Sequence, residues 1–138
     1  RLDDYFRTDY ITKEYHYKAA EFITKYDFNA HLEKLRKLYT KKAQFCMDLL
    51  DKYASPAITY HKIDGGLFIW CDLPESIDMP SFCKEAVLKK VCVVPGNAFL
   101  TDENEKCNSF RINFSTPTDE QLEKGIKILG ELANSKLK

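Results

Sequence analysis

A long amphipathic helix is the element that this sequence predicts most strongly, because apolar residues recur every three or four positions from Phe28 to Tyr53. The apolar stripe consists of Phe28, Leu32, Leu35, Tyr39, Ala43, Cys46, Leu50 and Tyr53. Asp27 can cap the start of this helix, and Ser55-Pro56 ends the pattern. A shorter helix is expected at about residues 17–24. A helix with one apolar face needs a second layer to cover it.

The stretch after the helix predicts a β-hairpin. Two runs rich in β-branched and aromatic residues, 58–63 and 67–73, are separated by Asp64-Gly65-Gly66. Glycines that adopt positive φ in a short connection between two such runs are typical of a hairpin turn. A short buried strand is also expected at residues 91–94, and Pro95-Gly96 ends it.

A further strand is expected at residues 109–115, where apolar and polar residues alternate. Phe110, Ile112 and Phe114 share one face, and the opposite face carries Arg111, Asn113 and Ser115. A guanidinium on the polar face of such a strand is either exposed or directed at an anion. The residues alone leave open whether Arg111 forms a salt bridge or binds a ligand.

Two more helices complete the expected architecture. One covers residues 81–90, follows Pro80, and has Phe82, Ala86 and Val87 facing inward. The last helix of the chain begins at a capping box formed by Thr118 and Gln121. Its inner stripe is Leu122, Ile126, Leu129, Leu132 and Ala133. The order of elements predicts an α+β fold, a small mixed or antiparallel sheet with helices packed on one face.

The composition of the chain argues against several classes of function. Lys and Arg together number 21 and so do Asp and Glu, which argues against a surface built to neutralise nucleic-acid phosphates. No apolar run reaches the length of a membrane-spanning helix. The five cysteines include no closely spaced pair and the three histidines are scattered, so no metal site is expected. The cysteines are interpreted as small core residues in a reducing compartment.

Three ordered motifs resemble a known family. They are Gly65-Gly66-Leu67-Phe68-Ile69-Trp70, Val93-Val94-Pro95-Gly96-Asn97-Ala98-Phe99 and Phe110-Arg111-Ile112-Asn113-Phe114-Ser115. Together they resemble the closing third of class I/II aminotransferases of fold type I, in particular the aminoadipate and multi-substrate group. The same block occurs in regulators that join an aminotransferase-like domain to a winged-helix domain. The resemblance runs from about Ala20 through the last helix.

The resemblance implies a domain assignment and a cofactor. Residues 18–138 would be the C-terminal small domain, and residues 1–17 a remnant of its junction with the large domain. The cofactor would be pyridoxal 5′-phosphate, bound by that large domain through a Schiff-base lysine and a phosphate cup that are not found here. The start at Arg1, without an initiator methionine, fits a fragment. The fragment alone is expected to be inactive, with no catalytic or cofactor-binding residue of its own.

The resemblance also implies substrate-binding residues and partners. Arg111 would grip the α-carboxylate of an amino acid or 2-oxo acid through two parallel hydrogen bonds. Asn97 and Phe99 would line the substrate cleft, and Gly66 would lie in the hairpin that flanks it. For Gly66 and the Pro95-Gly96 turn, a purely structural role explains the sequence equally well. The intact protein would be a cytoplasmic homodimer without a membrane segment, and the large domain would be this chain's own partner.

Two alternatives stay open at this point. The parent protein could be a transcriptional regulator, in which case nucleic acid would be a partner of its winged-helix domain. The chain could also be an unrelated α+β interaction module. That interpretation predicts an exposed Arg111 on a convex surface, with no concave face beside Phe99.

Overall fold

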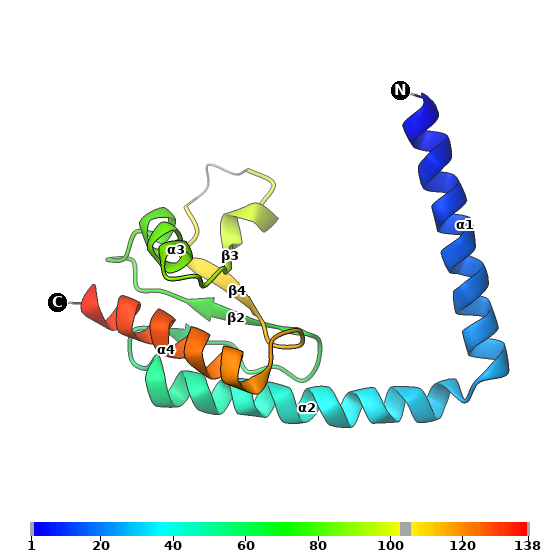
Figure 1. The fold of residues 1–138 in the computed structure, drawn as a ribbon. Helices are drawn as coiled ribbons and strands as arrows, with labels where there is room; N and C mark the ends of the chain where they lie inside the picture. Colours follow the sequence, from blue (N-terminus) through cyan, green and yellow to red (C-terminus); the bar gives the residue numbers. More distant parts are fainter. Residues whose placement is uncertain (1, 103–105, 138) are drawn as a thin grey trace. The chain divides into compact units, whose positions relative to one another are not determined.

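The computed structural model describes the backbone of residues 2–102 and 106–137 and the side chains of residues 13–102 and 106–137. Figure 1 shows the fold. In chain order the elements are α1 (Leu2–Lys25), α2 (Phe28–Tyr53), β1 (Thr59–Tyr60), β2 (Phe68–Asp72), α3 (Met79–Leu88), β3 (Val94–Pro95), the 3-10 helix η1 (Gly96–Phe99), β4 (Ser109–Asn113) and α4 (Asp119–Ser135). Within the described residues, no helix is long and apolar enough to cross a bilayer.

The chain divides into two compact units, residues 1–38 and 39–138. In the first unit, the Phe22 ring lies 5.3 Å from the Tyr26 ring and 5.2 Å from the His31 ring, measured between centroids. Asp27 caps α2 as predicted, because its Oδ1 accepts a hydrogen bond of 2.9 Å from the Ala30 N–H. The helix expected at residues 17–24 is the end of the much longer α1.

The predicted bounds of α2 are confirmed, but its apolar stripe is buried only in its second half. Ala43, Cys46 and Leu50 are buried, whereas Phe28 is exposed. Periodicity predicts which residues share a face of a helix, but not how far along the helix a second layer extends.

The second unit contains a four-stranded antiparallel sheet in the order β1-β2-β4-β3. β2 and β4 pair along their full length, with Trp70 opposite Arg111 and Cys71 opposite Phe110. β3 pairs with the other edge of β4 and places Val94 opposite Arg111. Arg111 therefore lies on a central strand, with a neighbouring strand on each side. The predicted α+β fold is confirmed.

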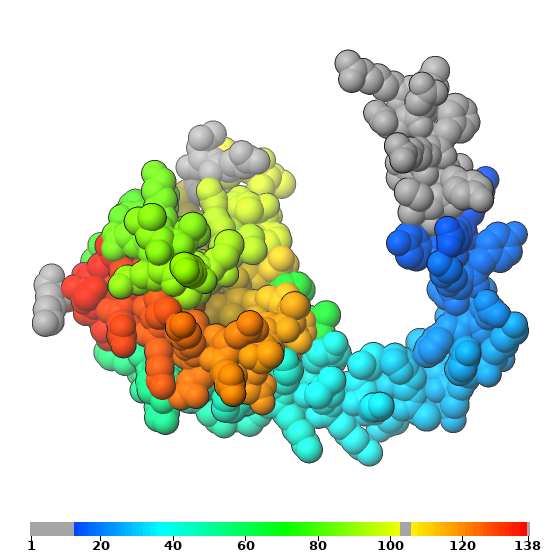
Figure 2. All heavy atoms as spheres, viewed as in Figure 1, coloured from blue at the N-terminus to red at the C-terminus, as the bar shows by residue number. Residues whose placement is uncertain are grey.

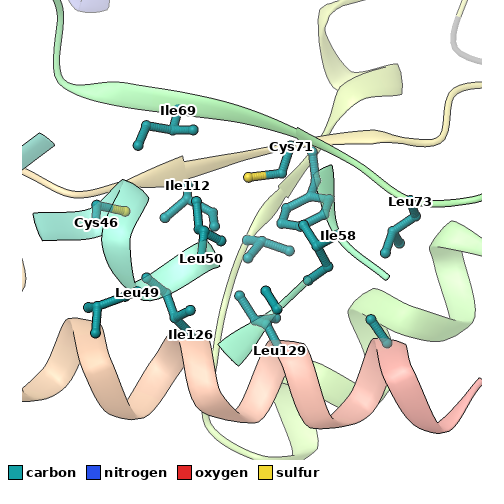
Figure 3. Close-up of a cluster of buried hydrophobic side chains, with 14 of the residues drawn as sticks. Cys46, Leu49, Leu50, Ile58, Ile69, Cys71, Leu73, Ile112, Ile126 and Leu129 are labelled. Atoms are coloured by element: carbon teal, nitrogen blue, oxygen red, sulfur yellow. The ribbon is translucent and has the colours of Figure 1, made fainter. Parts of the chain in front are cut away.

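One face of the sheet packs on the helices and forms the core. Figure 3 shows side chains from both central strands directed toward α4 and the end of α2. The labelled residues include Cys46, Leu49 and Leu50 of α2, Ile69 and Cys71 of β2, Ile112 of β4, and Ile126 and Leu129 of α4. Phe82 of α3 joins the same face, with its ring centroid 5.7 Å from that of Phe110. The alternation predicted for residues 109–115 is confirmed, because Phe110, Ile112 and Phe114 are all buried.

The predictions for helices α3 and α4 match the structure to different degrees. In α4 the capping box is present, since Gln121 N donates to Thr118 Oγ1 at 3.2 Å and Thr118 N donates to Gln121 Oε1 at 3.0 Å.

Helix α3 begins earlier than expected, at Met79, and Asp78 caps it. It packs against α4, and Figure 2 shows the two helices side by side (green and orange-red). The prediction that Val87 faces inward is wrong, because its side chain is 56% exposed. Phe82 and Ala86, four residues apart, define the buried face, and Val87 lies about 100° around the helix from Ala86.

The hairpin prediction holds in outline, with two corrections. β1 is only two residues long, and of the two turn glycines only Gly66 has a positive φ, 93°.

The strand expected at residues 91–94 starts only at Val94 and includes Pro95. Proline can serve there because β3 lies at the edge of the sheet, where no further strand requires its N–H.

Helix α3 ends in a left-handed residue that is not glycine. Lys90 has a φ of 65°, its N–H donates to Val87 O at 2.8 Å, and Val91 N donates to Ala86 O at 2.9 Å. This is the hydrogen-bond pattern of a Schellman motif, in which glycine usually occupies the position of Lys90.

Replacing Lys90 with glycine is therefore expected to stabilise the domain by about 0.5–1 kcal/mol, because a Cβ disfavours the left-handed conformation. Urea unfolding followed by circular dichroism measures this change. Lys89→Gly is the matched control, because Lys89 has a φ of −87° and gains nothing from glycine. The control should destabilise the domain by a similar amount. If both substitutions changed the free energy of unfolding in the same direction, the explanation would be contradicted.

Candidate functional site

Arg111 lies near the middle of β4, on the face of the sheet opposite the core. Its neighbours Phe110 and Ile112 point into the core, so the pleat of the strand directs Arg111 the other way. Trp70 and Val94 lie opposite it on the two adjacent strands. The predicted orientation of Arg111 follows from the same alternation, and its side chain is half-buried.

The guanidinium of Arg111 lies over two aromatic rings. Its Cζ is 4.0 Å from the centroid of the Phe68 ring and 4.5 Å from that of the Phe99 ring. Phe99 in turn meets Trp70 edge to face, with 5.3 Å between their centroids. A planar guanidinium is weakly hydrated and stacks well on such rings. The guanidinium of Arg111 therefore packs against two aromatic rings of this face.

No carboxylate neutralises Arg111 within residues 13–102 and 106–137, where side chains are described. Asp72 lies on the same face of β2, two residues from Trp70. Its carboxylate already has two partners: Oδ1 accepts a hydrogen bond of 2.5 Å from Ser109 Oγ, and Oδ2 lies 2.7 Å from His61 Nε2. As far as the described side chains go, the N–H donors of Arg111 are thus available to an external anion.

The structure brings only some of the predicted site residues together. Phe99 contacts Arg111 directly. Asn97 belongs to η1, as Phe99 does. It lines a hollow of about 500 Å³ together with Met79, Cys83 and Cys107, and Arg111 does not line this hollow. Gly66 lies in the turn before β2, two residues ahead of Phe68, and a Cβ at this position would meet no atom within 4 Å. The geometry therefore supports a site centred on Arg111 and Phe99.

Two residues of this face, Phe68 and Trp70, were not among the predicted site residues. Both belong to the Gly65–Trp70 motif, and the period of two in a strand puts them on one face. That alternation was a usable signal. What the sequence does not give is the register between β2 and β4, which places Trp70 opposite Arg111.

Potential metal ligands lie scattered among the described residues. No group of three potential ligands among His, Cys, Asp and Glu is found in the described residues. Cys46 and Cys71 are fully buried, as core residues would be, and burial raises the pKa of the Cys46 thiol to about 12. The interpretation as core residues is wrong for Cys92, which is exposed.

Comparison with known proteins decides the family. The sequence model described as "Aminotransferase class I and II" matches residues 10–129. The chain belongs to this family. The interpretation as an unrelated interaction module is therefore wrong. The resemblance drawn from the three motifs is confirmed, and members of the family use pyridoxal phosphate.

Relatives of this aminotransferase-family chain include both enzymes and regulators. An uncharacterised aminotransferase of Saccharolobus solfataricus is 34% identical over 121 residues, which are 88% of this chain and 30% of the relative. An uncharacterised HTH-type transcriptional regulator of Escherichia coli, YdcR, is 29% identical over 86% of this chain and 25% of the regulator. The crystal structure of the α-aminoadipate aminotransferase of Thermus thermophilus, complexed with N-(5′-phosphopyridoxyl)-L-leucine, matches with a TM-score of 0.76 and 28% identity. That match covers 86% of this chain and 30% of the crystallised one. The chain thus spans less than a third of the length of these proteins.

Proposed function

We propose that this chain is the C-terminal small domain of a pyridoxal-phosphate-dependent aminotransferase, in which Arg111 binds the α-carboxylate of the substrate. Residues 18–138 would form that domain, and residues 1–17 would belong to its junction with the large domain. The reaction would transfer an amino group from an amino acid to a 2-oxo acid. Its partners would be the large domain and a second copy of the longer protein. The observation that supports this most is the guanidinium of Arg111, which lies over Phe68 and Phe99 and pairs with no carboxylate in the described part of the chain.

The geometry explains what Arg111 would contribute to the reaction. A guanidinium can donate two parallel, charge-assisted hydrogen bonds to one carboxylate, which fixes both the position and the plane of that group. Holding the carboxylate fixes the orientation of the substrate Cα–H bond, and such orientation is a large part of catalysis. The apolar rings beside Arg111 keep water from part of its surface, which strengthens the charge interaction.

The residues of this chain do not fit the cofactor by themselves. A lysine that forms a Schiff base must lose its proton, which a desolvated environment favours. No charged residue is buried in the part of the chain whose side chains are described, so no lysine there has such an environment. The proposal accordingly assigns the cofactor to the large domain of a longer protein, and this chain contributes only the carboxylate site and the surface around it.

A transcriptional regulator is the second candidate function. The similarity to the E. coli regulator over 86% of this chain favours it, because the regulator contains a region like this one. In that case Arg111 would bind the carboxylate of an effector amino acid without turnover, and the winged-helix domain would bind DNA. Cytoplasmic localisation is expected for either protein.

The proposal is tested by comparing this chain with the longer protein. With pyridoxal phosphate, an amino acid and a 2-oxo acid, the longer protein should transfer the amino group, and this chain alone should not. Treating the chain with the cofactor and then with borohydride should give no stoichiometric label on any single lysine. One stoichiometrically labelled lysine in the chain would overturn the assignment of the cofactor to the large domain. A longer protein that binds amino acids and DNA but transfers no amino group would be the regulator.

A further inference from the structure

We infer that Phe68 and Phe99 are positioning residues, which hold the Arg111 guanidinium in place by their ring faces and leave its N–H donors free for a carboxylate. This inference rests on the proposed function of Arg111. It adds two residues from different elements, β2 and η1, to the site.

An arginine side chain stays in one position only if its neighbours hold it there. A long side chain with several rotatable bonds loses much entropy when it is fixed, so something must stabilise the fixed position. A neighbouring carboxylate would do so, but it would also occupy the N–H groups that bind substrate. An aromatic ring attracts the cation through its face and uses none of the five N–H donors. A binding arginine is therefore better held by rings than by an acid.

The contacts of Arg111 match this requirement. Cζ lies over the rings of Phe68 and Phe99, at 4.0 and 4.5 Å from their centroids. The carboxylate of Asp72, on the same face of the sheet, is bonded to Ser109 and His61 instead. Phe68 is 36% exposed to solvent and Phe99 is 47% exposed, so neither ring belongs to the buried core.

Phe99 is itself fixed from two directions. The edge-to-face contact with Trp70 holds its ring, with 5.3 Å between centroids. Its helical turn is packed closely on the start of β4: a Cβ on Gly96 would lie 2.6 Å from Cys107 Sγ and 2.7 Å from Ser109 O. Because η1 cannot shift easily, the ring that it carries can define the position of the guanidinium.

The first test uses this chain and does not depend on enzymatic activity. In an NMR spectrum of the side-chain Nε–H groups, ring currents from Phe68 and Phe99 should move the Arg111 resonance upfield. Arg36 is the internal control, because it is exposed and its one ion pair among the described residues is with Glu33 in the same helix. Phe99→Leu should move the Arg111 resonance toward that of Arg36, and Phe99→Tyr should leave it in place. An Arg111 resonance that is unshifted in the unmodified chain would overturn the inference.

The second test uses the longer protein and separates positioning from folding. Phe68→Leu and Phe99→Leu should each raise KM for the amino-acid substrate by roughly 2- to 30-fold, the range that corresponds to one cation–π contact. The tyrosine variants, which keep the ring, should stay within about twofold of the unmodified protein. Circular dichroism confirms that each variant is folded, and if Phe99→Leu does not fold, Phe68→Leu carries the test. Leucine variants with unchanged KM, or tyrosine variants as impaired as leucine, would overturn the inference.

The two proposals can fail separately. If the longer protein transfers no amino group but the Arg111 resonance depends on the two rings, the proposed function fails and the placement of Arg111 stands. If activity depends on Arg111 but neither ring affects its resonance or KM, the proposed function stands and the positioning role is wrong.

Discussion

Gly130→Ala is expected to destabilise the domain by about 3 kcal/mol or more, at or above the upper end of the usual effect of overpacking. Gly130 is buried in α4, where that helix meets the end of α2. A Cβ at this position would lie 2.1 Å from Tyr53 O and 2.7 Å from Tyr53 C. These are backbone atoms, which cannot rotate away, so the two helices would have to separate. Urea unfolding of the chain measures the loss.

Gly125→Ala is the matched control for this prediction. Gly125 lies in the same helix, and a Cβ there would meet only Val91 Cγ1, at 4.0 Å. Alanine is the better helix former, so this substitution should stabilise the domain by about 0.5–1 kcal/mol. The two alanines should therefore have opposite effects. Similar effects would mean that the contact between α4 and Tyr53 is not as close as the structure indicates.

Arg111→Lys is expected to lower kcat/KM of the longer protein by about 10- to 100-fold for each hydrogen bond lost. A lysine keeps the charge, but its ammonium group cannot reproduce two parallel hydrogen bonds to a carboxylate. Charge-assisted hydrogen bonds contribute about 1.5–3 kcal/mol each, and 1.4 kcal/mol corresponds to a tenfold change in rate. Stability should change little, because Arg111 points away from the core. Steady-state kinetics and urea unfolding measure the two effects separately.

Arg36→Lys provides the control for the chemical change itself. Arg36 is an exposed residue of α2 whose only described ion pair is with Glu33, at 3.2 Å. The same substitution there should leave kcat/KM within about twofold, as expected for an exposed pair of small energetic value. An equal loss in both variants would point to a general effect of replacing arginine.

Much of the secondary structure could be predicted because its signals are local. The stripe from Phe28 to Tyr53 gives the bounds of α2. The pair Thr118 and Gln121 marks the start of α4. The alternation around Arg111 places that residue on the face opposite the core before any strand pairing is known.

The remaining features depend on contacts between distant parts of the chain. Nothing in the sequence near Gly130 shows that the Tyr53 carbonyl approaches it. The left-handed Lys90 stands where a sequence pattern would look for glycine. The stacking of Arg111 on Phe68 and Phe99 depends on strand register and on the path of η1. For the same reason Asn97, which belongs to one of the three motifs, lines a hollow whose lining does not include Arg111.

The most direct measurement compares two substrates of the longer protein: an amino acid and the amine that lacks only its α-carboxylate. The preference for the amino acid, as a ratio of kcat/KM values, is measured before and after Arg111→Lys. If Arg111 binds the carboxylate, the variant should lose about 10- to 100-fold of that preference for each hydrogen bond removed, while its activity on the amine stays nearly unchanged. If activity on the amino acid and on the amine falls by the same factor, Arg111 does not bind the carboxylate, and the proposed role of this chain is wrong.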